Sequence, residues 1–549
     1  MVTDHLADLV SASVSKVLGS AAAAGSGSIE FERPKRKEHG DWSSNIALTL
    51  GREHGSPRDV AEKLARELPA SDVVERVEVA GPGFLNFYLS PAFFHDVVRR
   101  AADASSSFGR SNEPAERVNV EYVSANPSGP INVVSGRHAA VGDSIANLLE
   151  ATGNEVTREF YVNDAGRQMD LFGQSLAARY LELHGLEASI PEGGYQGDYL
   201  KEVAAGIAEE HGKSLVDLPG EERVRRFKEI GIGKMLDWMK STLERFGVRY
   251  DVWFRESSMH ESGAVKETIA EMKGKDLIEE REGALWFRSS EFGDDKDRVI
   301  VKANGDTTYL ASDIPYLKDK FARGFDRLIY LWGADHHGTI GRMKAAITAL
   351  GYDKNKVEIP LVQIVTLMSG TTAVKASKRA GVLVPLDELI DEVGVDAARY
   401  TFLTRSIDAP LEFDIDLVKE QAPENPVYYV QYAHARISSI LRRAEEEKAS
   451  FDPKVAPLES LTHMSEDDLM RKIASYEFVV PEAADFRAPQ RIARYVEELA
   501  SEFSAFYRDC KVMTDDKELT SARLSLCLAT RRVIADGLGL LGVGAPERM

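Results

Sequence analysis

The stretch from residue 118 to residue 169 constrains the fold more than any other part of the chain. Residues 118–123 alternate apolar and polar side chains, as a strand does, and residues 126–130 (Asn-Pro-Ser-Gly-Pro) have the composition of a turn. Apolar residues at helical spacing follow, in a helix expected to begin near Gly136, and then a second strand over 155–162. Such a βαβ unit predicts a doubly wound α/β domain whose helix N-terminus can bind an anion.

The remaining patterns predict three domains. Residues 1–112 form an N-terminal α+β module, in which the small-residue segment 19–28 is interpreted as a flexible connection. Strands and helices alternate over 113–405, as in a parallel sheet, with a charged and mostly helical insertion at about 175–290. Helical periodicity dominates 406–549, which predicts an all-α helical bundle.

Composition narrows the class of protein. Of 549 residues, 43% are apolar and 28% are charged, which is ordinary for a globular protein, and two cysteines indicate a reducing compartment. We find no signal peptide or apolar run long enough to span a membrane, so we expect a cytoplasmic protein. The net charge of −20 argues against a protein that binds DNA or RNA non-specifically. The same charge is compatible with a protein that binds tRNA through a local group of basic residues.

Several phrases inside and beyond the first βαβ unit resemble one family. They are Asn126-Pro-Ser-Gly-Pro-Ile131, Gly136-Arg137, Gly142-Asp143, Tyr161–Gln168, Glu38-His-Gly-Asp41 and Pro546–Met549. They are similar to bacterial arginine–tRNA ligases (arginyl-tRNA synthetases), which have a Rossmann-like class I catalytic core. The class I signature H-x-G-H falls on Asn132-Val-Val-Ser135, where both histidines and the glycine are replaced. The resemblance implies attachment of L-arginine to tRNA(Arg) through arginyl-adenylate, by a monomer whose N-terminal module grips the tRNA.

The resemblance also implies an ATP site at the altered signature. Lys375-Ala-Ser-Lys378 resembles the class I K-M-S-K loop, whose ammonium groups stabilise the leaving pyrophosphate. By this resemblance, the expected ATP-binding residues are Pro130, Asn132, Val134, Ser135, Gly136, His337, Lys375, Ser377 and Lys378. Four of them, Asn132, Ser135, Lys375 and Lys378, are expected to be catalytic. Mg²⁺ arrives with ATP, and we expect no metal held by the protein, because adjacent side chains on an extended segment at 336–337 point apart.

Five residues match the family's arginine pocket: Glu121, Asn126, Glu256, Tyr309 and Asp313. Tyr309 and Asp313 share one face if their segment is helical. Carboxylates pair with the fork of donors of a guanidinium, and an aromatic ring packs on its flat face. In the family Glu121 and Asn126 hold the α-amino and carboxylate ends of arginine. In most proteins, a tyrosine and an aspartate at the spacing of Tyr309 and Asp313 would simply be two solvated side chains on a helix surface.

The family's anticodon face matches Tyr429, Tyr432, Arg436, Tyr507 and Met549. The first three recur at helical spacing, so we expect one aromatic and cationic face that stacks on unpaired bases. In most proteins, the side chains of such a face would instead pack into the core. Two other functions stay open: a paralogue that binds tRNA or arginine without catalysis, and a ligase that activates arginine for a pathway other than translation.

Overall fold

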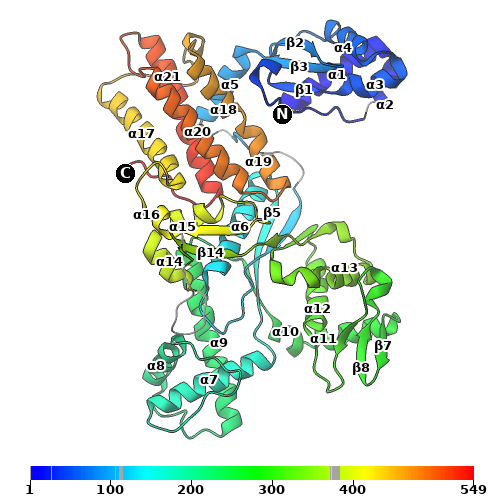
Figure 1. Ribbon diagram of the computed structural model, residues 1–549, viewed down its shortest axis with the longest axis vertical. Helices are drawn as coiled ribbons and strands as arrows, with labels where there is room; N and C mark the ends of the chain where they lie inside the picture. The colour runs from blue at the N-terminus through cyan, green and yellow to red at the C-terminus, as the bar shows by residue number, and fades with distance from the viewer. Residues whose placement is uncertain (1, 26, 106, 111–114, 371, 374–383) are drawn as a thin grey trace.

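The computed structural model describes residues 2–25, 27–105, 107–110, 115–370, 372–373 and 384–549. The molecule is elongated: the N-terminal module lies at one end beside the C-terminal bundle, the parallel sheet lies in the middle, and two lobes extend beyond it (Figure 1). Within the described residues no helix combines the length and apolar character needed to cross a membrane.

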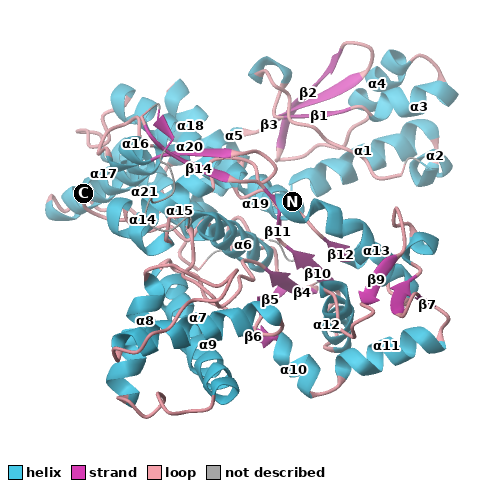
Figure 2. Cartoon of the chain, turned by 60° about the horizontal axis from the view of Figure 1, so that its bottom comes forward, coloured by secondary structure: helices cyan, strands magenta, loops and turns pink. Residues whose placement is uncertain are grey.

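A five-stranded parallel sheet forms the centre of the chain, in the order β12-β10-β4-β5-β6. Its strands are β4 (Arg117–Glu121), β5 (Glu155–Val162), β6 (Val252–Arg255), β10 (Arg327–Tyr330) and β12 (Val357–Glu358). The chain runs outward from β4 through β5 to β6 and then returns to the other side of β4. This reversal lies between β4 and β10, where ligands bind at the carboxyl ends of parallel strands. Figure 2 shows α6 (Val133–Ala151) and α12 (Tyr309–Ala322) on either side of the strands.

The predicted βαβ unit is confirmed, with two shifted boundaries. The second strand has the expected bounds, but β4 ends at Glu121 because Val123 and Ser124 have φ angles of +70° and +43°. Helix α6 begins at Val133, three residues earlier than predicted, because the Asn132 side chain caps it.

The single insertion predicted at about 175–290 is corrected to two, because β6 returns to the main sheet between them. The first lobe has its own apolar core and consists of α7 (Arg167–Leu183), α8 (Tyr199–His211) and α9 (Gly220–Arg245). The second contains α10 (Glu256–Glu261), α11 (Ala264–Gly274) and an antiparallel sheet of β7 (Ile278–Arg281), β8 (Ala284–Phe287) and β9 (Arg298–Val301).

Further along the chain, short strands and helices join the sheet to the bundle. They are β11 (Trp332–Gly333), α13 (Ile340–Ala349), β13 (Leu361–Val362), β14 (Val365–Ser369), β15 (Thr372–Ala373), α14 (Leu386–Val393), α15 (Val395–Phe402), β16 (Leu411–Asp414) and α16 (Ile415–Lys419). Strand β16 pairs in parallel with β14, so the segment expected to be purely helical from residue 406 begins with a strand.

The C-terminal bundle comprises α17 (Pro426–Glu446), α18 (Met464–Ala474), α19 (Tyr476–Asp485), α20 (Gln490–Asp509) and α21 (Lys517–Leu540). Helix α5 (Pro91–Ala102) packs against α21 and α18, although its residues fall in the predicted N-terminal module (Figure 1). The rest of that module is α1 (Val2–Leu18), α2 (Ser20–Gly25), β1 (Trp42–Ser44), α3 (Ile46–His54), α4 (Pro57–Arg66), β2 (Val74–Ala80) and β3 (Phe84–Leu89).

Candidate functional site

A strained turn follows β4 at the point where the sheet reverses. Val123 is β-branched and rarely adopts a left-handed backbone, so the surrounding structure must hold it there. The Ser124 hydroxyl donates to Glu121 Oε1 (3.1 Å) and accepts from the Tyr161 backbone N–H (3.2 Å). The turn thereby links the carboxyl ends of β4 and β5, and backbone strain of this kind is common at ligand sites.

Three carboxylates converge beside this turn. Glu121 ends β4, Glu256 begins α10 and Asp313 lies on the first turns of α12; the two glutamates are 5% and 7% exposed. Burial raises the pKa of Asp313 to about 7, and the charges of Glu121 and Glu256 raise it further. Burial raises the pKa of Tyr161, and the charges of Glu256, Asp313 and Glu121 raise it further. The cluster therefore carries more negative charge than its surroundings neutralise.

Only part of that charge has a positive partner. Lys320 is fully buried, and its Nζ lies 2.6 Å from Glu121 Oε2 and 3.9 Å from the centre of the Tyr330 ring. Glu256 lies 3.6 Å from the His260 Nε2, a weaker contact. Asp313 forms no hydrogen bond or ion pair with another described residue, and the charge of Arg342 lowers its pKa less than burial and the two glutamates raise it. A cationic group of a ligand would find Asp313 and Glu256 available.

The other two residues of the predicted pocket, Tyr309 and Asn126, are less buried than the two glutamates. Tyr309 begins α12, one turn before Asp313, and is 65% exposed. The helix that the sequence argument required there is confirmed. Asn126 donates from Nδ2 to Gln168 Oε1 (2.9 Å), so its side chain is tied to the start of α7.

The altered signature forms the N-terminal cap of α6. Asn132 Oδ1 accepts the backbone N–H of Ser135 (2.9 Å), which leaves the Asn132 amide hydrogens and the Ser135 hydroxyl without a described partner. Gly136 is buried and faces α14, where a Cβ would lie 2.6 Å from Leu386 Cδ1. Gly136 therefore serves close helix packing. Val134 is half-buried on the same turn.

The two residues after Gly136 point in different directions. Arg137 is fully buried and donates to the carbonyl oxygens of Gln363, Ile364, Ser406 and Ala409 at 2.8–3.3 Å. His138 is also buried, but its Cε1 lies 3.8 Å from the position a Cβ would take on Gly333. Burial, with Arg137 adding to it, lowers the pKa of His138 to about 4, so its imidazole is neutral.

Residues 334–339, after Gly333, form a short 3-10 helix rather than the extended segment expected. His337 is exposed on it. Across the described ranges, no group of three or more His, Cys, Asp or Glu side chains is placed to hold a metal ion. The predicted ATP residues Lys375, Ser377 and Lys378 lie outside the described residues.

An aromatic and cationic patch lies on the bundle. The Arg436 guanidinium lies 4.6 Å from the Tyr432 ring centre and 5.3 Å from that of Tyr507, and both rings are about 40% exposed. Tyr429 instead turns towards α20, where its hydroxyl lies 3.3 Å from Ser504 Oγ. Tyr428, which the sequence argument missed, stacks on Tyr432 with ring centres 6.0 Å apart. The exposed part of the predicted face thus consists of Tyr432, Arg436 and Tyr507, with Tyr428 stacked beside Tyr432.

Three family models match the chain in order. The arginyl tRNA synthetase N-terminal domain matches residues 4–89, the class I (R) tRNA synthetase catalytic domain matches 102–408, and the DALR anticodon binding domain matches 430–549. The chain belongs to the arginyl-tRNA synthetase family. The first model ends before α5, which agrees with the packing of that helix against the bundle.

Individual proteins of the family match over nearly the whole chain. An arginine–tRNA ligase from Carboxydothermus hydrogenoformans is 46% identical over 523 residues, covering 95% of this chain and 94% of that protein. One from Moorella thermoacetica is 47% identical over 523 residues, covering 94% and 93%. The solved arginyl-tRNA synthetase of Thermus thermophilus superposes with a TM-score of 0.78 over 100% of both chains, and at 23% identity this concerns the fold alone.

Within this family member, the structure adds residues that the sequence argument did not single out. Asp164 is buried and accepts the Ser257 backbone N–H (2.8 Å) and hydroxyl (2.8 Å), so it holds the turn that carries Glu256. Its place in the Tyr161–Gln168 phrase was a usable signal. No signal in the sequence pointed to Lys320, because its partner Glu121 lies 199 residues away along the chain.

Proposed function

We propose that this member of the family joins L-arginine to tRNA(Arg) through arginyl-adenylate, with its guanidinium bound by Asp313 and Glu256. The observation that carries the proposal is the carboxylate cluster, in which Asp313 forms no hydrogen bond or ion pair with another described residue and has a pKa raised to about 7. A guanidinium offers a rigid fork of N–H donors and a permanent positive charge. It would return Asp313 to its ionised form and complete the pocket.

The other residues of the pocket orient the rest of the amino acid. Glu121 and Asn126 are proposed for the α-amino and carboxylate ends, and Tyr309 for the flat face of the guanidinium. Glu121 keeps Oε1 near the mouth of the turn while Lys320 binds Oε2, so its net charge is reduced. Asp164 and Ser124 hold the turns and do not need to touch arginine.

ATP is proposed to bind at the N-terminus of α6. The cap turns the Asn132 carbonyl inward, so its amide hydrogens and the Ser135 hydroxyl remain free for phosphate oxygens, assisted by the helix dipole. The predicted contacts of Pro130, Val134, His337, Lys375, Ser377 and Lys378 stay part of this proposal, with Mg²⁺ carried by ATP. A carboxylate oxygen of arginine attacks the α-phosphorus, the bond to pyrophosphate breaks, and a terminal tRNA hydroxyl later displaces AMP.

His138 is proposed to replace the histidine missing at position 135. A helical side chain leans over the turn before it, so the imidazole of residue 138 covers the region above Ser135. Its ring lies beside Gly333, where the segment that carries His337 begins. Because the imidazole is neutral, it can donate one N–H to ATP without adding charge.

The exposed patch of Tyr432, Arg436 and Tyr507 is proposed to stack on anticodon bases, with Tyr428 and Met549 at its edge. Met549 is 56% exposed and shares a surface pocket with Tyr428. We further propose that the enzyme is a cytoplasmic monomer.

A charging assay with purified protein, arginine, ATP and tRNA(Arg) tests the proposal, together with ATP–pyrophosphate exchange. Formation of arginyl-tRNA is the expected result. If the protein binds tRNA but neither binds ATP nor forms adenylate, the binding-only alternative replaces this proposal. Adenylate formation without transfer to tRNA would favour a ligase of another pathway.

A further inference from the structure

Arg487 occupies a backbone conformation that favours glycine. It follows α19 with a φ angle of +51°; its N–H donates to the Ala484 carbonyl (3.1 Å) and that of Ala488 donates to the Ala483 carbonyl (2.8 Å). This is a left-handed helix C-cap, where glycine is the usual residue. A bulky residue held in such a conformation at a cost in strain indicates that its side chain contributes something that glycine cannot.

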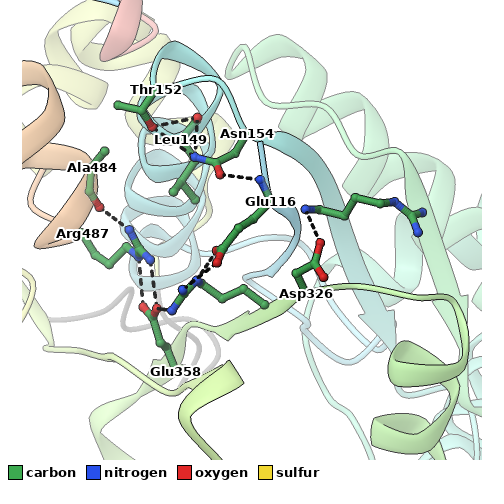
Figure 3. A network of polar contacts seen from close by, with 10 residues as sticks. Glu116, Leu149, Thr152, Asn154, Asp326, Glu358, Ala484 and Arg487 are labelled. Carbon is green, nitrogen blue, oxygen red and sulfur yellow. Dashed lines mark hydrogen bonds and ion pairs between the residues drawn. The ribbon is translucent and has the colours of Figure 1, made fainter. Parts of the chain in front are cut away.

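The Arg487 side chain begins a row of alternating charges (Figure 3). Its Nε and Nη2 donate to both carboxylate oxygens of Glu358 (3.0 and 2.9 Å). Glu358 Oε1 also accepts from Arg327 Nη1 (2.9 Å), and Arg327 makes two hydrogen bonds to Glu116 (2.7 and 3.1 Å). The hydrogen bond from Arg327 lowers the pKa of Glu116, so Glu116 stays charged at neutral pH.

This row joins three neighbouring strands, at the amino ends of β10 and β4 and at the last residue of the short β12. Glu358 lies on β12, Arg327 begins β10 and Glu116 immediately precedes β4. The opposite ends of β10 and β4 reach the proposed site, where Tyr330 is paired with Glu121. Both strands are only four or five residues long, so a shift at one end is carried to the other.

Arg487 itself belongs to the C-terminal bundle, not to the domain of the parallel sheet. A cleft of about 1070 Å³ lies between α19 and the strand ends, with Pro481 and Asp485 on the bundle side. Arg487 and Glu358 meet across it. The bundle carries the proposed tRNA patch. This ion pair is therefore one physical link from the bundle to the strands of the arginine pocket, beside the packing of α19 on α6.

We propose that Arg487 is a positioning residue through which tRNA bound to the bundle changes the affinity of the arginine pocket. The inference rests on the proposed function, because it assumes that arginine binds beside Glu121 and tRNA binds the bundle. Coupling of this kind is a difference in arginine affinity with and without tRNA.

The substitution Arg487→Gly tests this, because glycine keeps the left-handed backbone and removes only the side chain. Lys448→Gly is a matched control: Lys448 has a φ angle of +54° after α17, and the same pair of backbone hydrogen bonds closes its cap. The Lys448 side chain forms no hydrogen bond or ion pair with a described residue. A difference between the two variants therefore reports the Arg487 side chain.

Arginine affinity is measured by calorimetry with and without saturating tRNA(Arg), beside tRNA affinity and the melting temperature. We expect Arg487→Gly to reduce the tRNA-induced change in arginine affinity about fivefold or more, with tRNA affinity within about twofold. Lys448→Gly should match the unmodified protein. The double variant Glu358→Gln with Arg487→Gly should show the same tRNA-induced change in arginine affinity as Glu358→Gln alone. Either substitution already breaks the Arg487–Glu358 ion pair, so the second one adds nothing.

The inference is overturned if Arg487→Gly lowers the melting temperature but leaves the tRNA-induced change as in the unmodified protein, since Arg487 would then only fasten the two bodies. It is also overturned if tRNA does not alter arginine affinity in an unmodified protein that charges tRNA. If the unmodified protein binds no arginine, the proposed function fails first and this inference with it.

Discussion

Asp313 is the residue on which the chemistry proposed for this protein depends most. It forms no hydrogen bond or ion pair with a described residue, and burial, together with the charges of Glu121 and Glu256, raises its pKa to about 7. A group in this state is poorly suited to stabilising the free protein and well suited to receiving a cation. The neighbouring Glu121 differs, because Lys320 already neutralises it.

Arginine affinity should therefore depend on pH. Only ionised Asp313 attracts a guanidinium, so affinity should fall by up to about tenfold per pH unit as pH drops below about 7 and should level off above it. Calorimetry across pH 5.5–8.5 would measure this. Asp313→Asn should flatten the profile, and Asp313→Ala should weaken binding by roughly 2–5 kcal/mol. A steep profile that persists in Asp313→Asn would assign the titration to another group.

Moving the histidine along α6 tests the altered signature. His138→Ala should slow pyrophosphate exchange by about 100-fold, the usual effect of losing one donor to developing charge. Ser135→His added to that variant should restore much of the rate, because the imidazole returns to the first turn of the helix. Slow exchange in both variants, with a lowered melting temperature, would mean that His138 only fills the core.

At the scale of single elements, local chemistry explains some of the starts. Asn132 begins α6 by capping it, and the Ala-rich segment expected to be flexible forms α2 (Ser20–Gly25), because alanine has the highest helix propensity. Helix α17 shows the limit of such arguments. Its spacing predicts a face, but packing against α20 decides that Tyr429 turns inward and Tyr428 joins Tyr432.

Two substitutions on α17 should therefore behave differently. Tyr432→Ala should weaken charging by about 1–3 kcal/mol, the contribution of stacking on one base, and leave the melting temperature nearly unchanged. Tyr429→Ala should lower the melting temperature, because its ring is packed against the core. Charging kinetics and thermal unfolding of both variants measure the contrast. A sharp loss of stability in Tyr432→Ala would return that residue to core packing.

For the whole molecule, the proposed pocket predicts strict selectivity. Arginine should be the only standard amino acid attached to tRNA, because lysine leaves part of the carboxylate cluster without donors, and such polar mismatches discriminate by about 10⁴ or more. Charging assays with lysine and citrulline measure this. Efficient attachment of either one would contradict the assignment of Asp313 and Glu256.

The sequence alone determined the parallel domain, the helical bundle and the family, because periodicity, turn chemistry and short phrases depend on near neighbours in the chain. It also brought Glu121, Glu256 and Asp313 into one hypothesis, through the family resemblance. Only the tertiary structure decided which charges are paired, that β6 divides the insertion, that α5 joins the bundle and where His138 points. These depend on contacts such as Glu121–Lys320 across 199 residues, and no local pattern records which distant segment will pack against another.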